Sequence, residues 1–233
     1  MKTKIIVTIF GIIFINNTLI YGQNDSTNLS RTQISLYTSL LNSTNISDAH
    51  GNHGSYMGQP IDVTVEGIEL KHNWSIGINT KLHIFNKFNL QLDLLYSNSI
   101  FPDQEVILDG FNIKQKKSDL NFFTISVGPG FRYSDDRIFR ALNPYAFISF
   151  SLLLGFANDV GYMSAGRTSY SFVSGIGYNL QLGTQYNIDR FIISIEYRYE
   201  YLNSKVDYFR SFTEGLYFIK GSSSIFLGLG YAI

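Results

Sequence analysis

The chain has 233 residues with 18 basic and 18 acidic side chains, so its formal net charge is zero. Nothing in that balance indicates a nucleic-acid-binding protein, for which a basic excess is typical. The absence of cysteine excludes disulfides, cysteine-ligated zinc and thiol catalysis. Charged residues make up only 15% of the chain, whereas about 25% is usual in soluble domains.

Residues 1–22 have the pattern of a signal peptide. Two lysines precede the apolar run IIVTIFGIIFI, and Gly22 is a small residue suited to cleavage. The run is too short to cross a bilayer as a helix, which needs about 20 residues. We therefore expect export and a mature chain whose first residues, 23–30, form a flexible periplasmic tail. An uncleaved hydrophobic anchor is the alternative.

The remaining residues, 31–233, alternate between large apolar and small or polar side chains. A period of two is typical of strands with two unlike faces. Eight such segments follow one another in chain order: 32–41, 74–85, 88–97, 121–133, 144–155, 170–186, 191–201 and 216–233. The segment 144–155 is apolar on both faces, so its orientation stays open.

The connections between these segments alternate in length. Three short ones carry turn residues: 86–88, 134–138 and 187–189. The others are long: 42–73, 98–119, 156–169 and 203–214. An even number of strands, with short turns at one rim and long loops at the other, is the plan of an outer-membrane barrel. The pattern predicts an all-β fold, an eight-stranded antiparallel up-and-down transmembrane β-barrel.

The direction of the two faces follows from volume. The interior of an eight-stranded barrel is just wide enough to be filled by side chains or to hold one small ligand. The large apolar face supplies roughly five residues per strand by the alternation pattern, and that many cannot fit inside. The apolar face must therefore meet lipid, and a soluble ligand-binding barrel is the disfavoured alternative.

The inward face then carries several charges. The seven that we expect in the lumen are Lys81, Asp93, Arg132, Glu196, Arg198, Glu200 and Lys220. Because buried charges must pair, we interpret them as a salt-bridged structural plug. A proton path, a gate or a catalytic carboxylate pair are the functional alternatives.

The turn at residues 86–88 decides which of these charges meet. A three-residue turn would set Lys81 directly opposite Asp93. A five-residue turn would instead set His83 opposite Asp93 and leave Lys81 unpaired, which is unfavourable in a narrow lumen. We therefore predict the first register.

Other segments offer weaker signals. The segment 48–54 could hold a metal through Asp48, His50 and His53, but a solvated loop is the better interpretation. The basic stretch 114–117 could meet lipopolysaccharide phosphates. The alternating segment 61–70 should extend the first hairpin above the membrane and could offer a strand edge to a partner. We expect no cofactor, no metal and no catalytic site.

Two stretches carry a family resemblance: NPYAFISF, which starts at Asn143, and the C-terminal SIFLGLGYAI. With the eight-strand pattern, they resemble the small outer-membrane β-barrel proteins of Gram-negative bacteria, within them the PorT-like family of Bacteroidota. Tyr231 matches the aromatic residue third from the end in the signal that the barrel-assembly machinery reads, while the last residue is Ile233. The segment Asp25–Thr27 also resembles a short O-glycosylation motif of that phylum.

The resemblance implies a place in the outer membrane, surrounded by membrane lipid and lipopolysaccharide, with an unknown surface or periplasmic protein as a further partner. The expected role is non-enzymatic: envelope integrity, adhesion or an accessory part of a secretion system. A lipid A-modifying enzyme and a narrow pore are the alternatives.

Overall fold

The computed structural model describes residues 32–56, 59–65, 68–85, 87–102, 104–108, 111–115, 118–133, 142–158, 170–208 and 216–233. The predicted signal peptide, the tail at 23–30 and the glycosylation motif lie outside this range. None of the described residues forms a helix long and apolar enough to cross a membrane.

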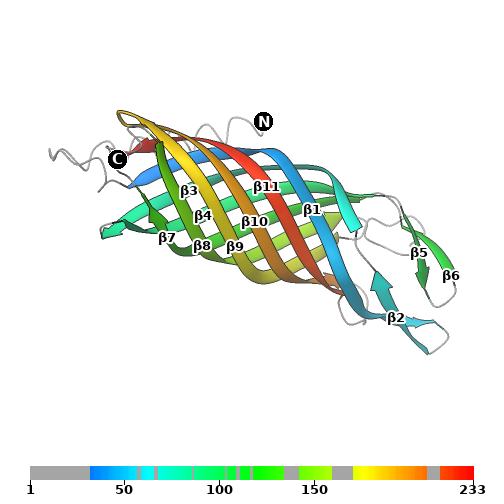
Figure 1. Cartoon of the computed structure of the whole chain (residues 1–233). Helices are drawn as coiled ribbons and strands as arrows, with labels where there is room; N and C mark the ends of the chain where they lie inside the picture. Colours follow the sequence, from blue (N-terminus) through cyan, green and yellow to red (C-terminus); the bar gives the residue numbers. More distant parts are fainter. Residues whose placement is uncertain are drawn as a thin grey trace.

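Eight long strands form a closed antiparallel β-barrel (Figure 1). They are β1 (Gln33–Tyr56), β3 (Ile68–Phe85), β4 (Phe88–Phe101), β7 (Ser118–Arg132), β8 (Leu142–Asn158), β9 (Tyr170–Ile188), β10 (Phe191–Tyr208) and β11 (Leu216–Ala232). Each strand pairs with the next one in this order, and β11 returns to pair with β1, where Gln33 lies opposite Ala232. Closure leaves no open edge, so every strand of the wall has two neighbours, as the hydrocarbon region requires. The predicted fold is confirmed.

Two expected loops are largely strand. Strand β1 runs past the barrel wall and pairs with β2 (Gln59–Val65), so that Ala49 lies opposite Val65. Strands β5 (Gln104–Leu108) and β6 (Phe111–Gln115) form a second hairpin between β4 and β7. The prediction of loops at 42–73 and 98–119 was wrong in this respect, because β-alternation continues there. The expected extension of the first hairpin is confirmed.

The short connections share one rim. The Arg132 amide donates to the Lys87 carbonyl at 2.9 Å, and the Ala232 amide donates to the Arg190 carbonyl at 2.8 Å. The first bond joins the β3–β4 turn to the end of β7, and the second joins the β9–β10 turn to the C-terminal strand. Gln33 of β1 lies opposite both Ala232 and Lys81, which places the two pairs at the same rim. The two extra hairpins lie at the opposite end of the barrel (Figure 1). The predicted placement of the turns near 87 and 189 is therefore confirmed, whereas 134–138 lie outside the described residues.

The outer wall is apolar. Leu92, Leu180 and Ile193, which we expected to face outward, are 44%, 40% and 41% exposed. Strand β8 follows the same rule: Phe147 is buried, whereas Phe150 is exposed. Soluble proteins rarely expose an apolar surface of this extent to water. The outward direction of the apolar face rules out the soluble barrel with an apolar interior.

The interior combines polar side chains with a few aromatic rings. The buried rings are Tyr37, Phe122, Tyr145, Phe147 and Phe226. Inward glycines provide their space, because a Cβ at Gly130 would collide with the Phe147 ring. Sequence alternation had placed Phe226 inward but left the other four unassigned.

Candidate functional site

All seven charged residues that we expected in the lumen are buried, and each residue is 0% to 4% exposed. They come from five strands: Lys81 from β3, Asp93 from β4, Arg132 from β7, Glu196, Arg198 and Glu200 from β10, and Lys220 from β11. Six of them form two clusters, and the seventh, Arg132, lies at the end of β7 near the short turns.

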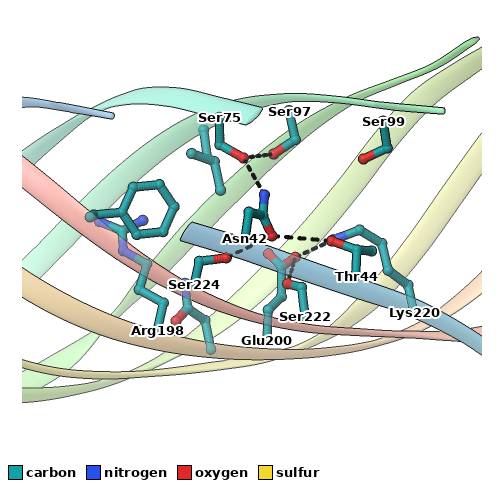
Figure 2. Close-up of a pocket in the computed structure, with 13 residues that line it drawn as sticks. Asn42, Thr44, Ser75, Ser97, Ser99, Arg198, Glu200, Lys220, Ser222 and Ser224 are labelled. Carbon is teal, nitrogen blue, oxygen red and sulfur yellow. Dashed lines mark hydrogen bonds and ion pairs between the residues drawn. The ribbon is translucent and has the colours of Figure 1, made fainter. Parts of the chain in front are cut away.

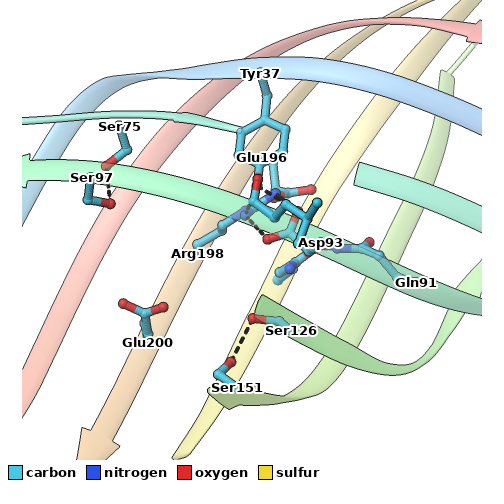
Figure 3. Close-up of polar contacts among 12 residues, drawn as sticks. Tyr37, Ser75, Gln91, Asp93, Ser97, Ser126, Ser151, Glu196, Arg198 and Glu200 are labelled. Carbon is cyan, nitrogen blue, oxygen red and sulfur yellow. Dashed lines mark hydrogen bonds and ion pairs between the residues drawn. The ribbon is translucent and has the colours of Figure 1, made fainter. Parts of the chain in front are cut away.

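The central cluster joins opposite walls of the barrel (Figure 3). The Arg198 Nη1 atom lies 2.7 Å from Asp93 Oδ2, and its Nη2 atom lies 3.3 Å from Asp93 Oδ1. Strands β10 and β4 are separated by three strands on either side of the closed sheet. This bidentate contact therefore spans the full width of the lumen.

Glu196 and two tyrosine hydroxyls add further contacts to this cluster. Arg198 Nε forms an ion pair with Glu196, and the Tyr145 hydroxyl donates to Glu196 Oε2 at 2.8 Å. The Tyr37 hydroxyl donates to Asp93 Oδ1 at 2.6 Å and accepts from Arg198 Nη1 at 2.9 Å. Dense hydrogen bonding is what makes buried ion pairs tolerable, since it replaces the lost hydration.

Two rings clamp the guanidinium group. The Arg198 Cζ atom lies 4.0 Å from the centre of the Tyr37 ring and 4.7 Å from that of Phe226. The rings meet edge to face, 5.2 Å apart with an interplanar angle of 86°. Arginine stacks well on aromatic faces because its charge is spread over a plane. The clamp holds the side chain extended across the lumen.

The predicted pairing of Lys81 with Asp93 was wrong. Lys81 lies opposite Gln91, and Asp93 lies opposite Asn79. The alternative pairing of His83 with Asp93 was wrong as well, since His83 lies opposite Asn89. The reason is local: Phe85 already pairs with Phe88, and a β-bulge between His83 and Phe85 shifts the ladder.

Lys81 has an aromatic environment instead of a cross-strand carboxylate. Its Nζ atom lies 3.5 Å from the centre of the Tyr145 ring and 5.4 Å from that of Phe147. Tyr145 in turn binds Glu196, so Lys81 is connected to the central cluster through one ring. Together, Lys81 and Arg198 balance the charges of Asp93 and Glu196.

The second cluster lies on the side of the long hairpins. Lys220 forms an ion pair with Glu200, and Ser222 Oγ donates to Glu200 Oε2 at 3.3 Å. A small cavity beside it, about 10 Å³, has room for about one water molecule (Figure 2). Its hydroxyl-rich lining includes a chain in which Asn42 donates to Ser75 at 3.0 Å and Ser75 contacts Ser97 at 2.9 Å.

Two further polar contacts lie in the lumen, one between distant strands and one between neighbouring strands. Gln91 Nε2 donates to Gln181 Oε1 at 2.6 Å, between β4 and β9. The hydroxyls of Ser126 and Ser151 lie 2.8 Å apart. Together with the charged clusters, these contacts fill successive levels of the lumen.

Sequence reasoning missed the roles of Tyr37 and Tyr145. The sequence did contain a signal for Tyr37. This residue lies two residues after Ser35, which was assigned inward, and residues two apart in a strand point to the same face. The register in the structure adds an inward glycine opposite each aromatic residue: Gly77 lies opposite Tyr37, and Gly183 lies opposite Tyr145. Such pairs indicate a large ring that fills the space of a missing side chain.

The other candidate residues lie in the long hairpins or near the short turns. The side chains of Asp48, His50 and His53, and those of residues 114–117, lie outside the described part. His83 lies on β3 near the short-turn rim. Among the side chains that the structure describes, no group of three or more histidines and carboxylates is placed to hold a metal.

Comparison with known proteins shows the fold. No protein-family model matches the chain, and no curated protein matches it in sequence. Among solved structures, it is similar to the outer membrane protein OprG from Pseudomonas aeruginosa, with a TM-score of 0.51, 11% identity and coverage of 89% of this chain and 100% of that one. It is also similar to the outer membrane protein AlkL, with a TM-score of 0.50, 10% identity and coverage of 91% and 95%.

At these identities the likeness is one of architecture. The chain has the eight-stranded fold of small outer-membrane barrels, and no particular family within that class is shown. The comparison adds no site residue, so the site rests on the contacts described above.

Proposed function

We propose that the protein is a non-enzymatic integral outer-membrane barrel with a closed lumen, which anchors two long hairpins at the cell surface. Its work is done by these hairpins, through contacts that support adhesion, envelope integrity or a secretion system. Export by the signal peptide at 1–22 and kinship with the PorT-like barrels of Bacteroidota are part of the proposal.

One observation carries the closed lumen: Arg198 and Asp93 join opposite walls while two aromatic rings hold the guanidinium group. Such a contact occupies the middle of the cross-section. Opening it would leave charges unpaired in a low-dielectric interior, which is strongly unfavourable. A solute path through this level would require that contact to break.

The outer surface supports a place in the membrane. Aromatic residues gather near both ends of the apolar wall, which is the arrangement of interfacial girdles. Near the short turns these are Phe88, Phe131, Tyr186, Phe191 and Tyr231, and toward the long hairpins they are Trp74, Tyr96, Phe123, Tyr178 and Tyr201. Membrane lipid and lipopolysaccharide are the proposed surroundings, and the barrel-assembly machinery is the proposed insertion partner.

Conductance in planar bilayers tests the closed lumen. The wild-type protein should produce no stepwise current, because the central cluster blocks the lumen. The double variant Arg198→Ala with Asp93→Ala removes the bridge and should produce small current steps. A matched control, Tyr197→Ala on the outer wall, should stay silent. Regular current steps from the wild-type barrel would contradict the proposal and favour the narrow pore.

The surface role can be tested in intact cells. Surface cross-linking followed by purification should recover the same protein partners from the wild type and from the Arg198→Ala, Asp93→Ala variant. A variant in which the β1–β2 hairpin is shortened should lose them. An unchanged set of partners after shortening both hairpins would refute the role, and a change in lipid A mass on deletion would favour the enzyme alternative.

A further inference from the structure

The aromatic rings of the girdle toward the long hairpins come from five strands, and β8, β11 and β1 contribute none. On β8 a leucine takes the place of a ring, because Leu154 lies opposite Phe123. On β3, β4 and β7 the rings touch: Trp74 and Tyr96 are 5.4 Å apart, and Tyr96 and Phe123 are 4.9 Å apart. On β9 and β10, Tyr178 and Tyr201 are stacked at 5.4 Å. Strands β11 and β1 lie between these two groups and carry small residues at the same level.

The register defines this gap. Tyr201 lies opposite Gly221, and Gly221 lies opposite Asn45. One step toward the short turns, Ser223 lies opposite Ser43. We call the four residues Ser43, Asn45, Gly221 and Ser223 the girdle slot. They face outward and are bordered on one side by the tyrosines of β10.

The girdle slot is open space. A Cβ atom added at Gly221 would meet no heavy atom within 4 Å. Its wall is held in place, since the hydroxyls of Tyr197 and Ser223 lie 3.3 Å apart. The slot is therefore a gap in the wall surface, with a polar floor and an aromatic side.

Two of the three polar side chains of the slot are unused. Within the described part of the chain, Ser43 and Asn45 have no side-chain hydrogen-bond partner, whereas the Ser223 hydroxyl contacts Tyr197. The comparable outward site on β4 and β7 is satisfied internally, because the Tyr96 hydroxyl and the Asn98 amide both donate to Asn121 Oδ1, at 2.7 and 3.0 Å. At the edge of a membrane, unused donors and acceptors are available to a lipid head group.

The surface directly below the slot is strongly apolar. A β-bulge between Ser39 and Leu41 turns two consecutive leucines outward, so that Leu40 is 54% exposed and Leu41 is 67% exposed. Ile225 lies opposite Leu41. From the middle of the wall toward the hairpins, the outward side chains thus change within a few residues from apolar ones to ones that form hydrogen bonds.

We propose that the girdle slot binds the sugar head group of an outer-leaflet lipid, whose acyl chains lie over Leu40 and Leu41. Sugar hydroxyls match the hydroxyl and amide groups of the slot, and the apolar face of a sugar ring packs on tyrosine. Phosphate recognition relies on arginine or lysine, and the slot contains neither. The inference rests on the proposed membrane location, so its test must separate the two.

The chain contains one tryptophan, and it reports on this surface. Trp74 is exposed on β3, the strand next to β1. Lipids with brominated acyl chains quench tryptophan on contact. We would reconstitute the full barrel in phosphatidylcholine vesicles and add dibrominated lipids with matched chains and three heads: glucosyl, phosphoglycerol and phosphoethanolamine. The glucosyl lipid should reach half-quenching at a mole fraction about threefold lower than the other two.

Two leucine substitutions locate the effect. Gly221→Leu fills the slot and should abolish the preference for the glucosyl head, while general quenching remains. Ser174→Leu adds the same side chain to the outer face of β9, at a distance from the slot, and should keep the preference. Retention of the preference in Gly221→Leu would overturn the site.

The other outcomes are equally informative. Equal quenching by all three heads, or a preference for phosphoglycerol, would overturn the sugar site but leave the membrane location intact. Weak quenching by every lipid at high protein density, relieved by dilution, would overturn it in favour of a second copy of the chain at this seam. No quenching at any protein density would contradict the membrane location itself.

Discussion

Arg198 is the residue on which the lumen depends most, because it contacts two carboxylates, one hydroxyl and two aromatic rings. Its charge and that of Lys81 balance Asp93 and Glu196. The balance means that the effect of removing one residue depends on which partners remain. Pairs of substitutions are therefore more informative than single ones.

The pair Asp93 and Arg198 should show strong coupling. Asp93→Leu leaves an excess of buried positive charge, and Arg198→Met leaves an excess of negative charge, so each should lower the free energy of unfolding by about 3–5 kcal/mol. The double variant keeps Glu196 and Lys81 in balance and should lose less than the sum of the two. Urea unfolding in lipid vesicles measures this cycle, and strict additivity would show that the contact is not a cooperative unit.

The Tyr37 hydroxyl should also be important for stability. Tyr37→Phe removes a group that bonds both Asp93 and Arg198 and leaves the ring in place, so it should cost about 1–3 kcal/mol. Tyr197→Phe is the matched control on the outer wall, where the change should stay within about 0.5 kcal/mol. Equal losses for the two variants would mean that the inner hydroxyl contributes nothing specific.

At the level of elements, the β3–β4 hairpin shows how a turn controls which side chains meet. The direct pairing of Phe85 with Phe88 shortens the turn. The bulge next to it turns the His83 side chain back to the inner face, opposite Asn89. Lys81 consequently meets Gln91. Shifting the partner by two residues preserves the faces but changes every cross-strand contact.

Disulfide formation on the outer wall tests this register. Leu82 lies opposite Leu90, whereas a three-residue turn would have set it opposite Leu92. The double variant Leu82→Cys with Leu90→Cys should therefore cross-link on oxidation in vesicles, since directly opposed Cβ atoms lie about 4.5–5.5 Å apart. The matched pair Leu82→Cys with Leu92→Cys should cross-link far more slowly. Faster cross-linking of the Leu82→Cys, Leu92→Cys pair would instead indicate the three-residue turn.

The whole molecule has an inverted distribution of polarity, with apolar residues on the outside and charges within. In water this arrangement would expose a continuous apolar belt, but in a bilayer it removes that belt from water. The same inversion isolates the lumen charges from solvent, which makes their pairing obligatory. The outer surface and the inner network are thus consequences of one environment.

Depth along the wall should decide how a charge is tolerated. Leu180 lies in the middle of β9, and Ile188 lies at its end near the short turns. Leu180→Arg should destabilise the barrel by about 2–4 kcal/mol, whereas Ile188→Arg should change it by about 0–1 kcal/mol. Unfolding by urea in vesicles gives both values. Similar losses at the two positions would show that the belt is not embedded as proposed.

The amino-acid sequence by itself determined the eight strands of the barrel wall and the direction of most of their side chains, but it did not include the extra strands β2, β5 and β6. The direction could be assigned because a strand repeats every two residues, so a short stretch such as Ile193–Tyr201 already separates its two faces. The volume of an eight-stranded barrel then assigned the bulky face to the outside. Strand β8 was the exception, since both of its faces are apolar and parity alone is uninformative.

Only the tertiary structure decided which inward residues meet. The partner of Asp93 is 105 positions away along the chain, on the opposite wall, and the contact exists only when the sheet closes. Closure depends on the stagger accumulated over eight strands, to which every bulge contributes, including those at Leu40 and near His83. Alternation records the face of a residue but not its height in the barrel, and for that physical reason the Arg198–Asp93 bridge could not be read from the sequence.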